Sequence, residues 1–181
     1  MRRDGVVNRE RILLAAEHVF GAGGAAASTE EVARQAQVGV ATVFRHFPTK
    51  QDLIEATAVR YLGKLEDETR RLADEADAGR AFASLMRVLV STGATKLTLL
   101  NLLPTDGNGL SKPVDTAAHS FLDAIRLVLE RAQAAGAARP DATVDDVSTL
   151  VRALAHVATP DEGEAVDRAL RIVLDGLGVP H

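Results

Sequence analysis

Residues 28–50 decide the fold of this chain, and they read S-T-E-E-V-A-R-Q-A-Q-V-G-V-A-T-V-F-R-H-F-P-T-K. Ser28 stands three residues before Glu31, which is the spacing of a capping box. In a capping box, the serine hydroxyl accepts a hydrogen bond from the backbone N–H of the glutamate. The glutamate carboxylate in turn accepts one from the backbone N–H of the serine. The pattern therefore predicts that a helix begins directly after Ser28.

This first helix is predicted to be short and to be followed by a tight turn and a second helix. Val32, Ala33 and Ala36 give it one apolar stripe. Gly39 is expected to supply the backbone freedom that the turn needs and to act as the N-cap of the second helix, because glycine is accepted at both positions. Two short helices joined in this way form a helix-turn-helix.

The second helix is predicted to begin at Val40 and to end before Pro48, whose ring cannot continue the hydrogen-bond ladder. Val43 and Phe47 are four residues apart and are expected to face the core. The opposite face carries short side chains and one arginine, from Val40, Ala41, Thr42 and Arg45. Short side chains allow the N-terminal end of a recognition helix to approach base edges in the major groove of DNA. Thr49 is expected to cap a third helix.

A helix-turn-helix is also an ordinary packing corner in all-α proteins, so its spacing alone leaves a structural and a DNA-binding interpretation open. The residue identities favour DNA binding. The segment resembles the DNA-binding domain of the TetR family of bacterial transcriptional regulators, whose turn and recognition helix commonly read V-S-x-G-T-L-Y-x-H-F, followed by a lysine. Residues 38–47 read V-G-V-A-T-V-F-R-H-F, and Lys50 stands at the place of that lysine.

The resemblance covers about the first third of the chain and implies contacts with bases and phosphates. The residues that it implies as DNA contacts are Thr29, Val40, Ala41, Thr42, Phe44, Arg45 and Lys50. Three departures from the family pattern matter: Phe44 lacks the phosphate-binding hydroxyl of the usual tyrosine, Gly39 replaces a capping serine, and Val40 offers no hydrogen bond. We therefore expect the deformability of the DNA site to carry more of the specificity, and direct readout of bases less.

The composition is that of a globular protein, because 46% of the 181 residues are hydrophobic. A chain of this length buries one substantial core or two small ones. The absence of cysteine excludes disulfides and thiolate catalysis. The net charge of −4 is uneven: residues 1–50 hold seven Lys or Arg against five Asp or Glu, and the remainder holds 14 against 20. A positive N-terminal part on an acidic body suits a protein that binds DNA at that end.

The N-terminus is charged and lacks the apolar core of a signal peptide, and no run approaches the roughly eighteen apolar residues of a membrane span. A cytoplasmic protein without a membrane partner is therefore expected. Arg2 and Arg3 are expected to form a mobile basic arm, followed by a helix from Asn8 to Phe20 that a glycine cluster ends.

The rest of the chain shows helical periodicity and no strand pattern. Helices are predicted over residues 49–75, 82–93, 95–103, 114–134, 144–154 and 166–177, with a long loop over residues 104–113 and a break at Thr159-Pro160. The chain is thus predicted to be all-α, with about nine helices. A three-helix helix-turn-helix DNA-binding domain is assigned to residues 1–50, and a larger helical ligand-binding and dimerisation domain to residues 51–181.

The last two predicted helices have broad apolar stripes, which either pack on their own subunit or pair with a second copy in a four-helix bundle. The resemblance implies the homodimer. A dimer would match a two-fold symmetric operator, with half-sites spaced by a multiple of about 34 Å. The residues assigned to the dimer interface are Val147, Leu150, Val151, Leu154, Val166, Leu170, Val173, Leu174 and Leu177.

The helices between Asp52 and Ala134 would enclose a small-molecule pocket in this family. The assigned lining is Leu62, Leu65, Phe82, Met86, Leu89, Leu99, Leu103, Phe121 and Ile125, with Asn101 and His119 as polar contacts. The alternative for each of these residues is ordinary core packing. Aromatic residues make up only 3% of the chain, so an aliphatic or small amphipathic effector is expected rather than a planar cation.

No catalytic motif stands out, because the five histidines lack metal-ligand spacing and no phosphate loop or nucleophile elbow is present. Catalytic residues, a metal and a cofactor are therefore not assigned, although His119 and His156 could form a pair. The leading interpretation is a ligand-responsive transcriptional regulator, a repressor that binds operator DNA as a homodimer. The alternative is a helical protein that binds a small molecule or a partner and has weak or lost sequence-specific DNA binding.

Overall fold

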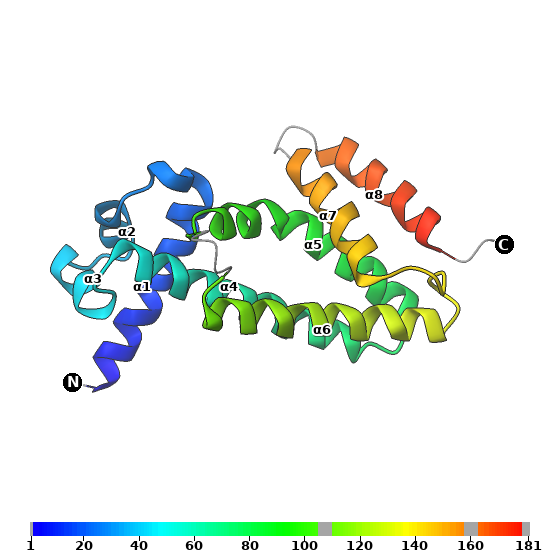
Figure 1. Ribbon diagram of the computed structural model, residues 1–181, viewed down its shortest axis with the longest axis horizontal. Helices are drawn as coiled ribbons and strands as arrows, with labels where there is room; N and C mark the ends of the chain where they lie inside the picture. Colours follow the sequence, from blue (N-terminus) through cyan, green and yellow to red (C-terminus); the bar gives the residue numbers. More distant parts are fainter. Residues whose placement is uncertain (1, 105–109, 158–162, 179–181) are drawn as a thin grey trace. The chain divides into compact units, whose positions relative to one another are not determined.

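The computed structural model describes residues 2–104, 110–157 and 163–178 (Figure 1). Over these ranges the chain is helical, and no strand is present among them. The elements are α1 (Arg2–Gly23), the 3₁₀ helix η1 (Gly24–Ala26), α2 (Thr29–Gln35), α3 (Val40–His46), α4 (Lys50–Ala73), α5 (Ala78–Asn101), α6 (Lys112–Ala134), α7 (Val144–Val157) and α8 (Gly163–Leu177). The all-α fold class is confirmed. Within the described ranges, no helix combines the length and the hydrophobicity of a membrane span.

The chain forms two compact units. The division into functional domains after residue 50 stays a prediction. The first unit comprises residues 1–62 and 95–117, and the second comprises residues 63–94 and 118–181. Each of the three long helices α4, α5 and α6 therefore contributes residues to both units.

The core of the first unit joins α1 to the two short helices and to the start of α4. Ile12 and Phe20 of α1, Val32 of α2, Val43 of α3 and Leu53 of α4 all have exposed fractions of zero. Each fully buried side chain of this size stabilises the fold by about 1.5–3 kcal/mol relative to exposure to water. The short helices are therefore fixed by their buried residues.

The N-terminal helix is longer than its sequence pattern indicates. It begins at Arg2, so the prediction that Arg2 and Arg3 form an arm ahead of the helix was wrong. It ends at Gly23, and Gly24 follows with a φ of +54°, a left-handed conformation that suits glycine. The predicted end at the glycine cluster is thus confirmed, a few residues later than expected.

The predicted break between residues 93 and 95 was also wrong, because α5 continues from Ala78 to Asn101 without interruption. Gly93 serves close packing rather than a turn. A Cβ atom built at Gly93 would lie 2.5 Å from the Cβ of Ala155 on α7, so only glycine lets the two helices approach this closely. Of the predicted loop over residues 104–113, residues 105–109 lie outside the described residues, and α6 already begins at Lys112.

The connection between α6 and α7 is held by hydrogen bonds to backbone carbonyl oxygens within the second unit. The Gln133 side-chain amide donates to the carbonyl oxygens of Arg139 and Ala142, at 3.1 and 2.9 Å. The backbone N–H of Arg139 donates to the carbonyl oxygen of Leu177 at the end of α8, at 2.8 Å. The predicted break at Thr159-Pro160 lies outside the described residues, while both flanking helices are confirmed.

Two glycine-to-alanine substitutions should have opposite effects on stability. Gly93→Ala should lower the free energy of unfolding by about 1–3 kcal/mol, because its new methyl group overlaps Ala155. Gly63→Ala is the matched control, since Gly63 lies inside α4 with nothing within 4 Å of its Cβ position. There the change should raise stability by about 0.5–1 kcal/mol. Urea denaturation measures both, and equal effects would contradict the packing role of Gly93.

Candidate nucleic-acid interface

The capping box that starts α2 is confirmed by its geometry. The backbone N–H of Glu31 donates to the Ser28 hydroxyl at 3.2 Å, and the N–H of Ser28 donates to the Glu31 carboxylate at 2.8 Å. Val32 and Ala33 are buried, as the apolar stripe predicts. An N-cap of this kind contributes about 1 kcal/mol. The start of α2 is therefore determined by local sequence.

In the turn between α2 and α3, a different residue from the predicted one adopts the left-handed backbone conformation. Gln37 adopts the left-handed conformation, with φ at +54°, whereas Gly39 is extended, with φ at −70° and ψ at 147°. The N–H of Val38 donates to Ala33 at 3.0 Å, and the N–H of Gln37 donates to Arg34 at 3.1 Å. These two bonds form a Schellman motif, which places Gln37 where helices usually have glycine. Gly39 is the N-cap of α3, as expected.

The two faces of α3 are divided as the spacing predicts. Val43 is fully buried and Phe47, the C-cap, is 3% exposed. On the other side, Ala41, Phe44 and Arg45 are exposed, while Val40 and Thr42 are half-buried. Phe44 is 42% exposed. The surface of α3 available to DNA is therefore short-chained at its N-terminal end, with Arg45 as its strongest donor.

Two of the residues assigned to DNA contact are already engaged within the first unit. Thr29 is only 6% exposed. The Lys50 ammonium donates to the carbonyl oxygens of Ala27 and Ala25, at 2.6 and 3.3 Å, and lies 5.8 Å from the centre of the Phe20 ring. Lys50 thus satisfies carbonyl groups around η1, and a phosphate contact would have to compete with these bonds.

Two arginines of α1 reach the helix-turn-helix and were missed from the sequence. The Arg9 guanidinium lies 5.2 Å from the centre of the Phe47 ring, within the range of a cation–π contact. Arg11 donates to the side-chain carbonyl of Gln37 at a long 3.5 Å. No local pattern indicates these pairs, because each joins residues far apart in the chain.

Two ion pairs of Arg60 also connect α1 and α4 within the first unit. The Arg60 guanidinium of α4 contacts Glu10 at 2.5 Å and Glu17 at 2.7 Å, both on α1. The start of α4 is fixed by Thr49, whose hydroxyl and backbone N–H both donate to the Asp52 carboxylate, at 2.8 and 3.0 Å. The Thr49 hydroxyl also accepts from the backbone N–H of Asp52, at 3.0 Å, so the predicted Thr49 cap is confirmed. The ion pair and the cap orient α4 against α1, the helix that packs against α2 and α3.

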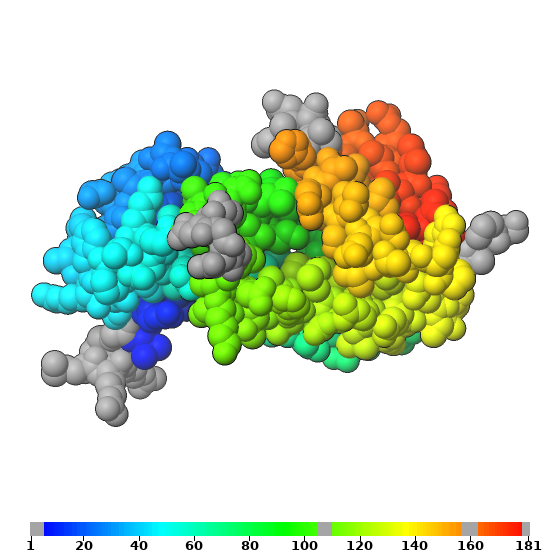
Figure 2. Space-filling view, viewed as in Figure 1, coloured from blue at the N-terminus to red at the C-terminus, as the bar shows by residue number. Residues whose placement is uncertain are grey.

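The residues assigned to the dimer interface fall into two groups in the second unit. Val147, Val151, Leu170 and Leu177 are already buried within the chain. The half-exposed ones are Leu150, Leu154, Val166, Val173 and Leu174. Ile172, which the periodicity did not select, is 67% exposed on α8. Figure 2 shows α7 and α8, coloured orange to red, at the molecular surface.

A groove of about 500 Å³ runs between α7 and α8, with Leu150, Ile172 and Val173 among its lining residues. Charged residues form its rim. The Arg139 guanidinium donates to the Asp141 carboxylate at 2.6 and 2.7 Å, which lowers the pKa of Asp141. The pKa of Asp146 is lowered as well, because the Thr143 hydroxyl and backbone N–H donate to its carboxylate. Both carboxylates therefore stay ionised at neutral pH.

The residues assigned to effector binding are all buried. Leu62, Leu99 and Leu103 belong to the first unit, and Leu65, Phe82, Met86, Leu89, Phe121 and Ile125 belong to the second. Asn101 and His119, the assigned polar contacts, are exposed, as is His156. Across the part of the chain that the structure describes, no group of three or more metal-binding side chains could hold an ion.

These features define a class of protein. A capped helix, a Schellman turn and a second helix with a short-chained exposed face, supported by α1, constitute a helix-turn-helix DNA-binding unit on an all-α body. Comparison with protein families shows which family within this class the chain matches. Residues 12–57 match the family described as "Bacterial regulatory proteins, tetR family", and residues 77–179 match "Transcriptional regulator SbtR-like, C-terminal domain".

Solved structures agree with the family models. The chain is 33% identical to a TetR transcription regulatory protein from Mycobacterium vanbaalenii, with 98% of this chain and 99% of that one covered and a TM-score of 0.77. It is 30% identical to the TetR transcriptional regulator SCO0520 from Streptomyces coelicolor, with 96% and 99% covered and a TM-score of 0.80. None of the curated proteins compared with it matches. The chain belongs to the TetR family of transcriptional regulators.

Replacing Gln37 with glycine should stabilise the first unit by about 1 kcal/mol, because a left-handed conformation is unfavourable for a residue with a Cβ atom. Gly39→Ser is the matched comparison in the same turn. A Cβ there would meet only Thr42 Oγ1 at 3.9 Å, and the serine hydroxyl could cap α3 for a few tenths of a kcal/mol. Thermal denaturation of both variants measures the difference. A destabilised Gln37→Gly protein would show that the Gln37 side chain matters more than its backbone.

Proposed function

We propose that the protein represses transcription by binding a two-fold symmetric operator as a homodimer, and that a small molecule releases it. The observation that carries the DNA-binding part is the exposed face of α3. Ala41 and Arg45 are accessible there, while Val43 and Phe47 anchor the helix in the core. A helix held in this way can enter the major groove without losing its own packing.

The DNA contacts proposed from the sequence divide by accessibility. Arg45 is the candidate for base readout, because an exposed guanidinium can donate two hydrogen bonds to a guanine. Ala41, Thr42, Val40 and Phe44 are proposed to pack against base edges and sugars. Thr29 and Lys50 are proposed to act at the backbone, Lys50 partly by ordering the segment around Ala27.

Replacing Arg45 with alanine should weaken operator binding by about 1–3 kcal/mol and relax the preference at one base pair. The measurement is a gel shift with DNA from upstream of the chain's own gene, at two salt concentrations. Arg87→Ala is the matched control, because Arg87 is exposed on α5 in the second unit. Genuine operator binding weakens with salt yet keeps a large preference over random DNA.

The same measurement decides the alternative function. A helical protein that binds a small molecule or a partner, with lost DNA specificity, is favoured by one observation: Phe44 is exposed and has no hydroxyl for a phosphate. That protein would bind operator and random DNA equally, and Arg45→Ala would leave its affinity unchanged.

The homodimer is proposed to form through the exposed parts of α7 and α8. Ile172 and the half-exposed Leu150 and Val173 line the groove between these helices, and a second copy would remove them from water. The four interface residues that are buried within the chain are proposed to support this surface from below.

Replacing Ile172 with aspartate should convert a dimer into a folded monomer, because a charge in an apolar seam is strongly unfavourable while an exposed position tolerates it in the free subunit. Leu127→Asp is the matched control, since Leu127 is also aliphatic and 41% exposed, on α6. Sedimentation velocity measures the mass of both variants. An intact Ile172→Asp dimer would remove this surface from the proposal.

The effector is proposed to be aliphatic or amphipathic and to bind, without chemical conversion, among buried apolar residues such as Leu89 of the second unit. It can release DNA only if it binds the DNA-incompetent arrangement more tightly, and the shift cannot exceed that difference in affinity. The protein is proposed to act in the cytoplasm, where bacterial DNA lies.

Replacing Leu89 with phenylalanine should lower the response to the effector if Leu89 lines a pocket. Operator release by a panel of aliphatic acids, amines and alcohols is measured beside the melting temperature. Reduced release at an unchanged melting temperature supports a pocket wall. Early melting with loss of operator binding means that Leu89, which is 2% exposed, is only core and has been overpacked by about 1–3 kcal/mol.

A further inference from the structure

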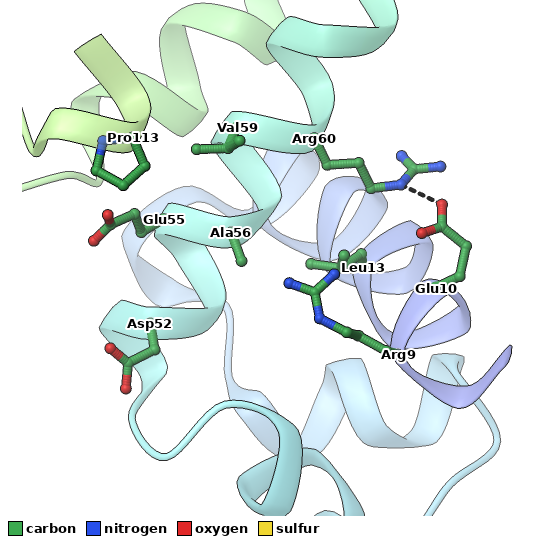
Figure 3. Close-up of a pocket in the computed structure, with 9 residues that line it drawn as sticks. All are labelled: Arg9, Glu10, Leu13, Asp52, Glu55, Ala56, Val59, Arg60 and Pro113. Atoms are coloured by element: carbon green, nitrogen blue, oxygen red, sulfur yellow. Dashed lines mark hydrogen bonds and ion pairs between the residues drawn. The ribbon is translucent and has the colours of Figure 1, made fainter. Parts of the chain in front are cut away.

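A cleft of about 520 Å³ lies in the first unit between α1 and α4, apart from the core residues assigned to the effector. Figure 3 shows its walls: α1 contributes Arg9 and Leu13, α4 contributes Asp52 and Glu55, and Pro113 at the start of α6 closes one side. The volume falls within the range of small-molecule sites, about 300–1,000 Å³. Leu13 and Val59 are among the apolar residues of its lining.

Of the five charged residues that line the cleft, Arg60 and Glu10 are paired with each other, and the other three keep free bonding capacity. Arg60 is paired with both Glu10 and Glu17, so it offers no excess charge. Glu55 uses one carboxylate oxygen to accept from the Ser111 hydroxyl, at 2.5 Å, and Asp52 uses one to accept from Thr49. Each of these two carboxylates keeps a second oxygen.

Arg9 is the cationic group that remains. Its guanidinium lies on the Phe47 ring, and among the described residues no acceptor is assigned to its N–H groups. A ring face attracts the cation but leaves the in-plane N–H groups free for a carboxylate. In Figure 3 the carboxylates of Asp52 and Glu55 lie on one side of the cleft, and Arg9 extends from α1 on the other.

We propose that this cleft binds a small zwitterion with an aliphatic body, of the amino-acid class. Its ammonium group would bind Glu55 and Asp52, its carboxylate would bind Arg9, and its side chain would cover the half-buried Ala56 and Val59. A ligand with a single charge would meet a like charge on one side of the cleft, whereas a zwitterion matches both. The bond to Arg9 connects this site to the C-cap of the recognition helix.

The test uses isothermal titration calorimetry on the full chain with three probes of one shape. L-leucine carries both charges, 3-methylbutylamine lacks the carboxylate, and 4-methylpentanoate lacks the ammonium. Leucine should bind about tenfold or more tightly than either other probe, because each lost charged hydrogen bond is worth at least that factor. Affinity in the millimolar range is expected, since Arg9 and Asp52 are exposed.

Two substitutions assign the ends of the ligand. Arg9→Gln should reduce leucine binding to the level of 3-methylbutylamine and leave that amine unchanged. Glu55→Gln should reduce leucine binding toward the level of 4-methylpentanoate. Arg87→Gln, an exposed arginine of the second unit, is the control and should change nothing.

The proposal is overturned if leucine gives no binding heat at millimolar concentration, if the three probes bind equally, or if both substitutions leave leucine binding unchanged. If Arg9→Gln lowers the melting temperature, the same titrations are carried out with Arg9→Lys instead. Lysine keeps the charge, so the preference for leucine over the amine should persist in that variant, and its loss would contradict the proposed role of position 9.

Discussion

The DNA-binding unit depends on the burial of one face of a helix that is too short to be stable alone. The α3 helix has seven residues, whereas isolated helices shorter than about 12–15 residues are marginal in water. Val43 and Phe47 provide the stability that so short a helix lacks, because both are buried in the core formed with α1, α2 and α4. Ala41 and Arg45 are held in a defined direction only because the opposite face is fixed.

Specific polar contacts also fix the positions of the helices around α3. The Schellman bonds fix the angle at which α3 leaves α2, and the two ion pairs of Arg60 hold α1 against α4. Lys50 ties the start of α4 to the backbone around Ala27. Lys50, which the family motif assigns to a phosphate contact, therefore also holds the unit together, and a substitution there is expected to change stability as well as any DNA affinity.

In the second unit, some apolar residues of α8 are buried and others are exposed. Leu170 and Leu177 of α8 are buried against their own chain, while Ile172, between them in sequence, is mostly exposed. Helical periodicity shows which apolar residues share one face of a helix. It does not show how much of that face is buried by the rest of the same chain. The exposed remainder is the surface through which the homodimer is proposed to form.

The sequence alone determined the helix-turn-helix, because its signals are local. The Ser28 capping box, the Thr49 cap and the four-residue spacing of Val43 and Phe47 each act within one turn of helix. Local chemistry likewise predicted the all-α class and most helix positions.

Tertiary structure decided what depends on residues far apart in the chain. A break is predicted between residues 93 and 95, yet α5 continues through both, and glycine is needed at position 93 because Ala155 of α7 approaches too closely for any side chain. Gln37, rather than Gly39, takes the left-handed conformation, because α2 ends in a Schellman motif whose two hydrogen bonds close on Ala33 and Arg34. The contacts of Arg9 and Arg60 join elements tens of residues apart, so no local pattern contains them; they exist only once packing has brought α1 against its neighbours.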